Sequence, residues 1–104
     1  MRVELLYWDG DSDYMSARQN LVEVLTEDAF ETTIQMIAVS SDEDATFLAF
    51  PGSPTIRIDG VDIDPPGAGE VGLHRRDYGG TRVPGKDLIR RAVERARGWS
   101  HGRR

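Results

Sequence analysis

The chain contains no cysteine among its 104 residues. Thiol–disulfide exchange begins with a thiolate attacking sulfur, so this chain cannot carry out thiol redox chemistry as written. The absence of cysteine also excludes a small secreted scaffold that is held together by disulfides. We therefore expect a cytoplasmic protein whose stability comes from one modest packed core.

Long apolar runs and clustered histidines are also missing. No apolar run approaches the roughly 18 residues that a membrane-spanning helix needs. Glu4 interrupts the first apolar stretch, which argues against a secretory signal there. The two histidines, His74 and His101, lie far apart and do not have the spacing of a zinc site. We therefore expect no membrane association, no metal and no cofactor.

Charge is distributed unevenly along the chain. Acidic residues dominate residues 1–74, most of the 13 basic residues lie in 75–104, and the net charge is −5. We expect the acidic and basic parts to attract each other across the fold. The alternative is that the basic end binds nucleic acid or another anionic surface, but the overall acidity argues against nucleic acid.

Short apolar and β-branched runs predict the strands. Asp59-Gly60, between two alternating stretches, is the strongest short-range hairpin signal in the chain. The predicted strands are 3–8, 32–39, 56–58 and 61–63, with a further short strand at 73–78.

Three stretches have the spacing of helices. The first contains Tyr14 and Leu25, and Asp11, Ser12 or Asp13 can cap it. Ser40 to Glu43 has the pattern of a capping box, which opens a second helix that must stop near Phe50 because Pro51-Gly52 follows. A third helix is predicted to begin near Pro84 and to place Ile89 and Val93 on its apolar side.

The predicted order is β-α-β-α-β-β-α, which defines the fold class as α/β. The first two strands should be parallel because a helix joins them, and the hairpin strands must be antiparallel. A mixed four-stranded sheet flanked by helices follows. We expect one domain at residues 1–97 and a flexible basic tail at 98–104.

Two sequence blocks carry a resemblance that extends over nearly all of residues 3–97. Leu5–Gly10 and Phe50–Gly60 together resemble the thioredoxin-like superfamily, and more narrowly a group of small bacterial thioredoxin-like proteins. In that group a cysteine or selenocysteine follows the first glycine, and another cysteine lies in a Gly-Leu-x-Cys-Arg segment. Asp11 and Arg75 occupy these two positions here.

The resemblance implies a thioredoxin-like fold with a cis peptide bond before Pro54. It also implies that the backbone of Ser53 offers itself to an extended peptide by strand addition. Asp11 and Arg75 are expected to form an ion pair where the family has its cysteines. The expected binding residues are Trp8, Asp11, Tyr14, Ser53, Pro54 and Thr55.

Two functions follow from this resemblance. The first is a redox-inactive module that binds a peptide or protein through the cis-proline face. The alternative is a variant of a thiol or selenol oxidoreductase whose redox residues at positions 11 and 75 have been replaced. Glutathione binding of the glutaredoxin type is disfavoured, because residues 64–67 replace the polar motif expected there. The partner and the oligomeric state are left open.

The acidic loop after the first strand allows a third function. Asp9 and Asp11 have the Asp-x-Asp spacing of phosphatases that form an aspartyl-phosphate, but that chemistry also needs a lysine, and the one lysine is Lys86. A calcium loop of the EF-hand type is disfavoured, because Tyr14 and Asn20 stand where it needs glycine and glutamate.

Overall fold

A mixed four-stranded sheet flanked by helices forms the architecture, which confirms the predicted α/β class. The computed structural model describes residues 1–27, 32–65 and 70–101. The elements in chain order are β1 (Val3–Tyr7), α1 (Tyr14–Glu27), β2 (Ile34–Ala38), α2 (Asp42–Phe47), β3 (Thr55–Ile58), β4 (Val61–Asp62) and α3 (Lys86–His101). Their order is the predicted one.

The strands lie in the order β2-β1-β3-β4. β1 runs parallel to β2 and antiparallel to β3, as expected for two strands joined through a helix and a third that returns. β3 and β4 form the predicted hairpin, in which Asp59 and Gly60 have φ angles of 53° and 83°. Positive φ at both turn residues is typical of a type I′ turn, whose twist matches that of the two strands.

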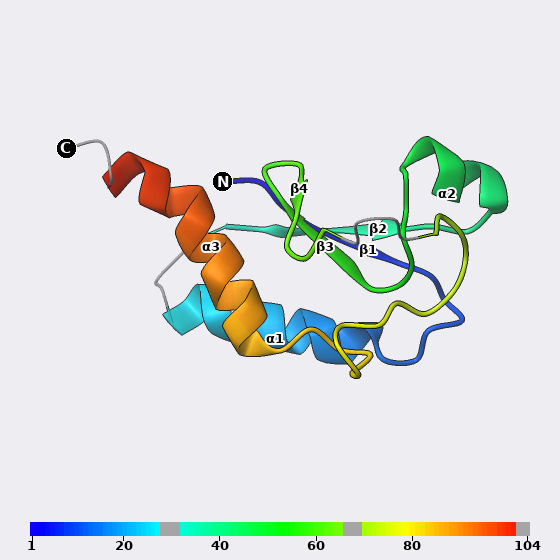
Figure 1. Cartoon of the computed structure of the whole chain (residues 1–104), viewed down its shortest axis with the longest axis horizontal. Helices are drawn as coiled ribbons and strands as arrows, with labels where there is room; N and C mark the ends of the chain where they lie inside the picture. The colour runs from blue at the N-terminus through cyan, green and yellow to red at the C-terminus, as the bar shows by residue number, and fades with distance from the viewer. Residues whose placement is uncertain (28–31, 66–69, 102–104) are drawn as a thin grey trace.

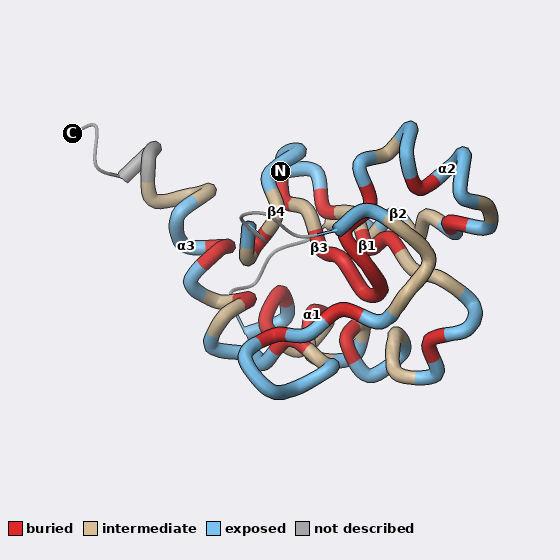
Figure 2. Tube along the Cα trace, turned by 45° about the vertical axis from the view of Figure 1, so that its right-hand side comes forward, coloured by how far each residue is buried: buried red, intermediate tan, exposed pale blue. Residues whose placement is uncertain are grey.

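Helices cover both faces of the sheet (Figure 1). α1 and α3 pack together on one face, and α2 lies on the other, toward the end of the sheet. Successive residues of β1 point to opposite faces: Leu5 joins a core cluster with Leu21 and Val93, whereas Leu6 joins a second cluster with Phe50. Figure 2 shows this buried material along β1 and β3 and on the inner side of α1. Burial of each such side chain contributes about 1.5–3 kcal/mol.

The predicted capping box of α2 is wrong by one residue. Ser41, not Ser40, is the N-cap, and its hydroxyl oxygen accepts a hydrogen bond from the Asp44 N–H at 3.0 Å. Two serines in succession give the same local signal. Ser41 is the residue with the extended backbone (φ −144°, ψ 162°) that an N-cap requires, so it takes the role.

The last helix is longer than predicted. α3 begins just after Pro84 and continues through His101, so it extends beyond the expected domain end at residue 97. The predicted flexible tail at 98–104 therefore starts inside a helix, and residues 102–104 lie outside the described residues. No helix in the described ranges is long and apolar enough to cross a membrane.

Ion pairs join the acidic and basic parts of the chain, which confirms the expected attraction between them. Glu23 and Glu27 of α1 pair with Lys86 (2.6 Å) and Arg90 (2.8 Å) of α3. The hydrogen bond from Lys86 lowers the pKa of Glu23 and raises the pKa of Lys86. These groups are solvent-exposed, so each pair contributes little to stability.

Candidate functional site at the cis-proline loop

The peptide bond between Ser53 and Pro54 is cis, as predicted, and it lies immediately before β3. Ser53, Thr55 and Asp11 have no exposed surface, and Pro54 is also buried. Four of the six predicted binding residues therefore come together, but they lie inside the protein and not on a face that a partner can touch.

A chain of hydrogen bonds connects Asp11 to this loop. The Trp8 N–H donates to the Ser53 hydroxyl oxygen (3.0 Å), and that hydroxyl donates to Asp11 Oδ2 (2.8 Å). The Asp13 N–H donates to the other carboxylate oxygen of Asp11 (2.9 Å). Because each carboxylate oxygen has a donor, the buried acid is satisfied. Asp11 thus ties the loop after β1 to the loop before β3.

The predicted ion pair between Asp11 and Arg75 is not formed. The Arg75 side chain is exposed, and no salt bridge joins it to Asp11, although both residues are described. The two positions nevertheless meet at one residue, since Asp11 bonds to the side chain of Ser53 and Arg75 pairs with its backbone in an isolated parallel bridge. The strand predicted at 73–78 is therefore not formed, and the isolated bridge at Arg75 is present in its place.

The segment from His74 to Tyr78, which we call the strap, occupies the backbone of Ser53. The Ser53 N–H donates to the His74 carbonyl oxygen, and the Arg76 N–H donates to the Ser53 carbonyl oxygen, both at 2.8 Å. The predicted strand addition of a partner peptide at Ser53 therefore has no free backbone group to use while the strap is in place. The chain has added its own strand there.

Glycine is required where the strap passes the loop. Gly52 has a φ of +120°, and a Cβ built there would lie 2.9 Å from the His74 ring. The two ring nitrogens of His74 lie 3.1 Å from the carbonyl oxygens of Glu70 and Arg75. The His74 ring thus bonds within its own segment, and its backbone carbonyl is the group that joins the strap to Ser53.

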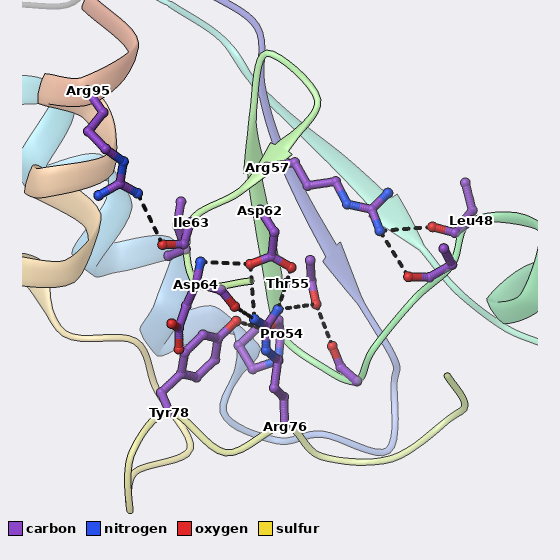
Figure 3. Close-up of polar contacts among 12 residues, drawn as sticks. Leu48, Pro54, Thr55, Arg57, Asp62, Ile63, Asp64, Arg76, Tyr78 and Arg95 are labelled. Atoms are coloured by element: carbon purple, nitrogen blue, oxygen red, sulfur yellow. Dashed lines mark hydrogen bonds and ion pairs between the residues drawn. The ribbon is translucent and has the colours of Figure 1, made fainter. Parts of the chain in front are cut away.

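Arg76 anchors the strap from inside the protein (Figure 3). Its side chain is 5% exposed and makes a bidentate pair with Asp62 of β4, at 2.8 and 3.0 Å. It also donates to the Thr55 hydroxyl oxygen (3.1 Å) and to the Asp64 carbonyl oxygen. The Thr55 hydroxyl in turn donates to the Gly52 carbonyl oxygen (2.7 Å). One guanidinium therefore joins the strap, the hairpin and the cis-proline loop.

Tyr78 closes the far end of the strap. Its hydroxyl donates to the carbonyl oxygen of Pro54, and its ring centroid lies 4.6 Å from the guanidinium carbon of Arg76. Burial raises the pKa of Tyr78 well above its ordinary value, although the positive charge of Arg76 acts in the opposite direction. The phenol therefore stays neutral and remains a hydrogen-bond donor at physiological pH.

Sequence reasoning did not identify Arg76, Tyr78 or Asp62. One signal was available: in an extended segment, alternate residues share a side, so Arg76 and Tyr78 face inward together while Arg75 and Asp77 face outward. Arg76 meets Asp62 of β4, 14 positions away, and Tyr78 meets Pro54, 24 positions away, so no local pattern indicates these contacts.

The exposed part of the site is a rim, which we define as Trp8, Asp9, Tyr14 and Arg75. Trp8 and Tyr14 are half-buried, and Asp9 and Arg75 are exposed. The Tyr14 ring stacks on Tyr7 with centroids 4.3 Å apart. Neither Asp9 nor Arg75 forms a salt bridge within the described ranges. The rim therefore presents two aromatic rings and two unpaired charges of opposite sign.

The acidic loop does not assemble the phosphoryl-transfer site considered from the sequence. Lys86 lies on α3 and pairs with Glu23, and Asp11 is held by Ser53 and Asp13. No group of three or more potential metal ligands occurs among the residues that the structure describes.

Comparison with known proteins gave no match. A scan against family models found none, and searches of curated proteins and of solved structures also found none. The function of the chain must therefore be argued from the geometry of this site.

Proposed function

We propose that the chain is a redox-inactive protein of thioredoxin-like fold that binds a protein partner through the rim of the cis-proline site. The strand order β2-β1-β3-β4, with β1 parallel to β2, supports the fold assignment. So does the cis bond immediately before β3. The cytoplasmic location predicted from the sequence remains a prediction.

One observation carries the proposal: the interior of the site is fully satisfied. Asp11 is buried with a donor on each carboxylate oxygen, and both backbone groups of Ser53 are paired with the strap. An interior in which every polar group has a partner holds its loops in one arrangement but leaves no group to react or to pair. The surface that remains available is the rim.

The chemistry of the rim suits a protein interface. Aromatic and arginine side chains dominate the binding energy of many interfaces, and the rim contains Trp8, Tyr14 and Arg75. The Trp8 side chain packs against the core cluster that contains Leu6 and Phe50, which holds its ring in place. A preorganised aromatic loses little conformational freedom on binding, which favours affinity.

The test reverses the exposed charges of the rim. We would couple the chain to a resin, identify the proteins it retains from a native lysate, and measure the Kd of the purified partner by calorimetry. Asp9→Arg and Arg75→Glu should each weaken binding by roughly tenfold or more, which corresponds to about 1.4 kcal/mol. Arg91→Glu, an exposed charge reversal on α3, is the matched control. Equal affinity of all three variants and the original chain would contradict the proposal.

A specific observation also favours the alternative, a variant of a thiol or selenol oxidoreductase. Positions 11 and 75 both contact Ser53, one through its side chain and the other through its backbone. The double variant Asp11→Cys/Arg75→Cys should then form a disulfide that dithiothreitol reduces reversibly, as measured by mass spectrometry under redox buffers. Each single-cysteine variant is the control. If both thiols of the double variant stay free in oxidising buffer, this alternative is contradicted.

A further inference from the structure

The outer edge of β2 carries backbone groups that have no partner in the described part of the chain. β2 pairs with β1 on one side, and the Val39 N–H donates to the Tyr7 carbonyl oxygen at 2.7 Å. Backbone groups alternate in direction along a strand. The N–H and C=O groups of Ile34, Met36 and Ala38 therefore point away from β1, and they form no backbone hydrogen bond within the described ranges.

In the described part of the chain, this edge lacks three of the features that commonly protect a sheet edge. Charged side chains, proline and bulges prevent edges from pairing with another chain. β2 reads Ile-Gln-Met-Ile-Ala, and residues 32–41 contain no charge and no proline. The opposite edge, β4, is only two residues long and carries Asp62. The two edges of one sheet thus differ, and β2 is the one that is open to pairing.

We propose that the outer edge of β2 pairs antiparallel with the same edge of a second copy of this chain. The pairing is centred on Met36, which faces Met36 of the second copy, while Ile34 faces Ala38. These are the residues whose backbone groups point outward, so each facing pair can exchange both of its hydrogen bonds. The edge is therefore self-complementary in an antiparallel two-fold arrangement, and the two four-stranded sheets become continuous.

Charge favours the antiparallel arrangement. α2 lies beyond one end of β2, and the chain N-terminus lies beside the other (Figure 1). Asp42, Glu43 and Asp44 of α2 are exposed and form no ion pair within the described ranges. Arg2, which lines a cavity beside the start of β2, pairs with Glu4 at 3.7 Å and keeps 62% of its side chain exposed. Antiparallel pairing brings these acids toward Arg2 of the other copy and keeps the two α2 helices apart. Parallel pairing would bring the two acidic helices together.

The interface should be weak. A pairing of five residues is small beside the roughly 1,200 Å² that stable interfaces bury, and a net charge of −5 on each copy opposes association. We therefore expect a dimer whose population depends on protein concentration.

A single introduced cysteine tests the pairing, because the chain has no cysteine of its own. In the proposed register the two Met36 Cα atoms are about 5.5 Å apart, which a disulfide can span. Met36→Cys should form a covalent dimer at least roughly tenfold faster under mild oxidant than Met15→Cys, an exposed methionine of α1 that serves as the matched control. Equal rates for the two variants would overturn the proposal.

Sedimentation equilibrium of the unmodified chain provides a test that needs no disulfide. The apparent mass should rise from the monomer toward twice that value as the concentration approaches about 1 mM. Gln35→Lys, which places a charge on the proposed interface, should shift this rise to several-fold higher concentration. A chain that stays monomeric over the whole range would overturn the proposal. This holds even if the β2 edge pairs with a different protein, because the proposed partner is a second copy of this chain.

Discussion

Two backbone sites of the same sheet are treated in opposite ways. At Ser53, just before β3, the chain pairs both backbone groups with its own strap. At the outer edge of β2, the outward-facing groups have no partner in the described residues. Ser53 is fully buried, so water cannot reach an unpaired backbone group there, and leaving one unpaired would cost stability. β2 is partly exposed, so water can hydrogen-bond to its outward-facing backbone groups. Burial thus decides which of the two sites the chain must close.

Closure at Ser53 depends on long-range anchors. The strap makes only an isolated bridge with the loop, which by itself is a small contribution. Arg76 and Tyr78 add contacts to β4, to β3 and to the carbonyl of the cis-proline. This comparison predicts that stability is concentrated at the strap and nearly absent from the β2 edge.

The largest expected effect is that of removing the strap anchor. Arg76→Ala leaves the partly buried carboxylate of Asp62 without its cation, so we expect the free energy of unfolding to fall by about 3–5 kcal/mol. Arg91→Ala, an exposed arginine of α3, should change it by no more than about 0.5 kcal/mol. Urea denaturation followed by fluorescence measures both. Similar losses for the two variants would break the comparison.

Next in size is the loss of the buried acid. Asp11→Ala leaves the Ser53 hydroxyl and the Asp13 N–H without their acceptor, and each buried unpaired group costs about 1–3 kcal/mol. Asp9→Ala is the control, since Asp9 is exposed and two positions away. Denaturation of the two variants side by side tests this, and equal stability would mean that the Asp11 contacts contribute nothing.

A smaller effect, with its own pH dependence, is expected at Tyr78. Tyr78→Phe removes the hydrogen bond to Pro54, so the free energy of unfolding below pH 9 should fall by about 1 kcal/mol. Because the folded-state pKa of Tyr78 is raised, its contribution is complete below the ordinary tyrosine pKa of about 10 and is lost as pH rises toward the folded value.

Above pH 10, ionisation of Tyr78 should therefore lower the unfolding free energy of the original chain by up to about 1.4 kcal/mol per pH unit. The phenylalanine variant should lack this decrease. Unfolding free energies of both chains between pH 8 and 11 provide the measurement. A constant difference between the two chains across this range would show that Tyr78 does not titrate differently on unfolding.

The smallest effect should be that of a change on the β2 edge. Gln35→Lys alters an exposed side chain that makes no hydrogen bond or ion pair within the described ranges. The unfolding free energy measured in dilute solution should therefore change by no more than about 0.5 kcal/mol. A loss comparable to that of Asp11→Ala would mean that the edge is already part of the folded structure of the single chain.

Much of the fold was predictable because its signals are local. The Asp59-Gly60 turn and the two central strands are determined by a few adjacent residues, and the structure agrees on each. The sequence does not distinguish Ser40 from Ser41 as the cap of α2, because the two serines give equal local signals, and the structure places the cap at Ser41. The site was predictable only in part: Asp11 does meet Ser53, but Arg75 does not pair with Asp11.

The sequence by itself determined that these 104 residues supply no thiol, since none of them is a cysteine. It also determined the order of strands and helices through hydrophobic periodicity and turn residues. Only the tertiary structure decided that the cis-proline loop is closed by the strap, that Arg76 holds it there, and that β2 forms an open edge. These features depend on contacts between segments far apart in the chain, whose hydrogen bonds form only once packing brings them together and excludes water.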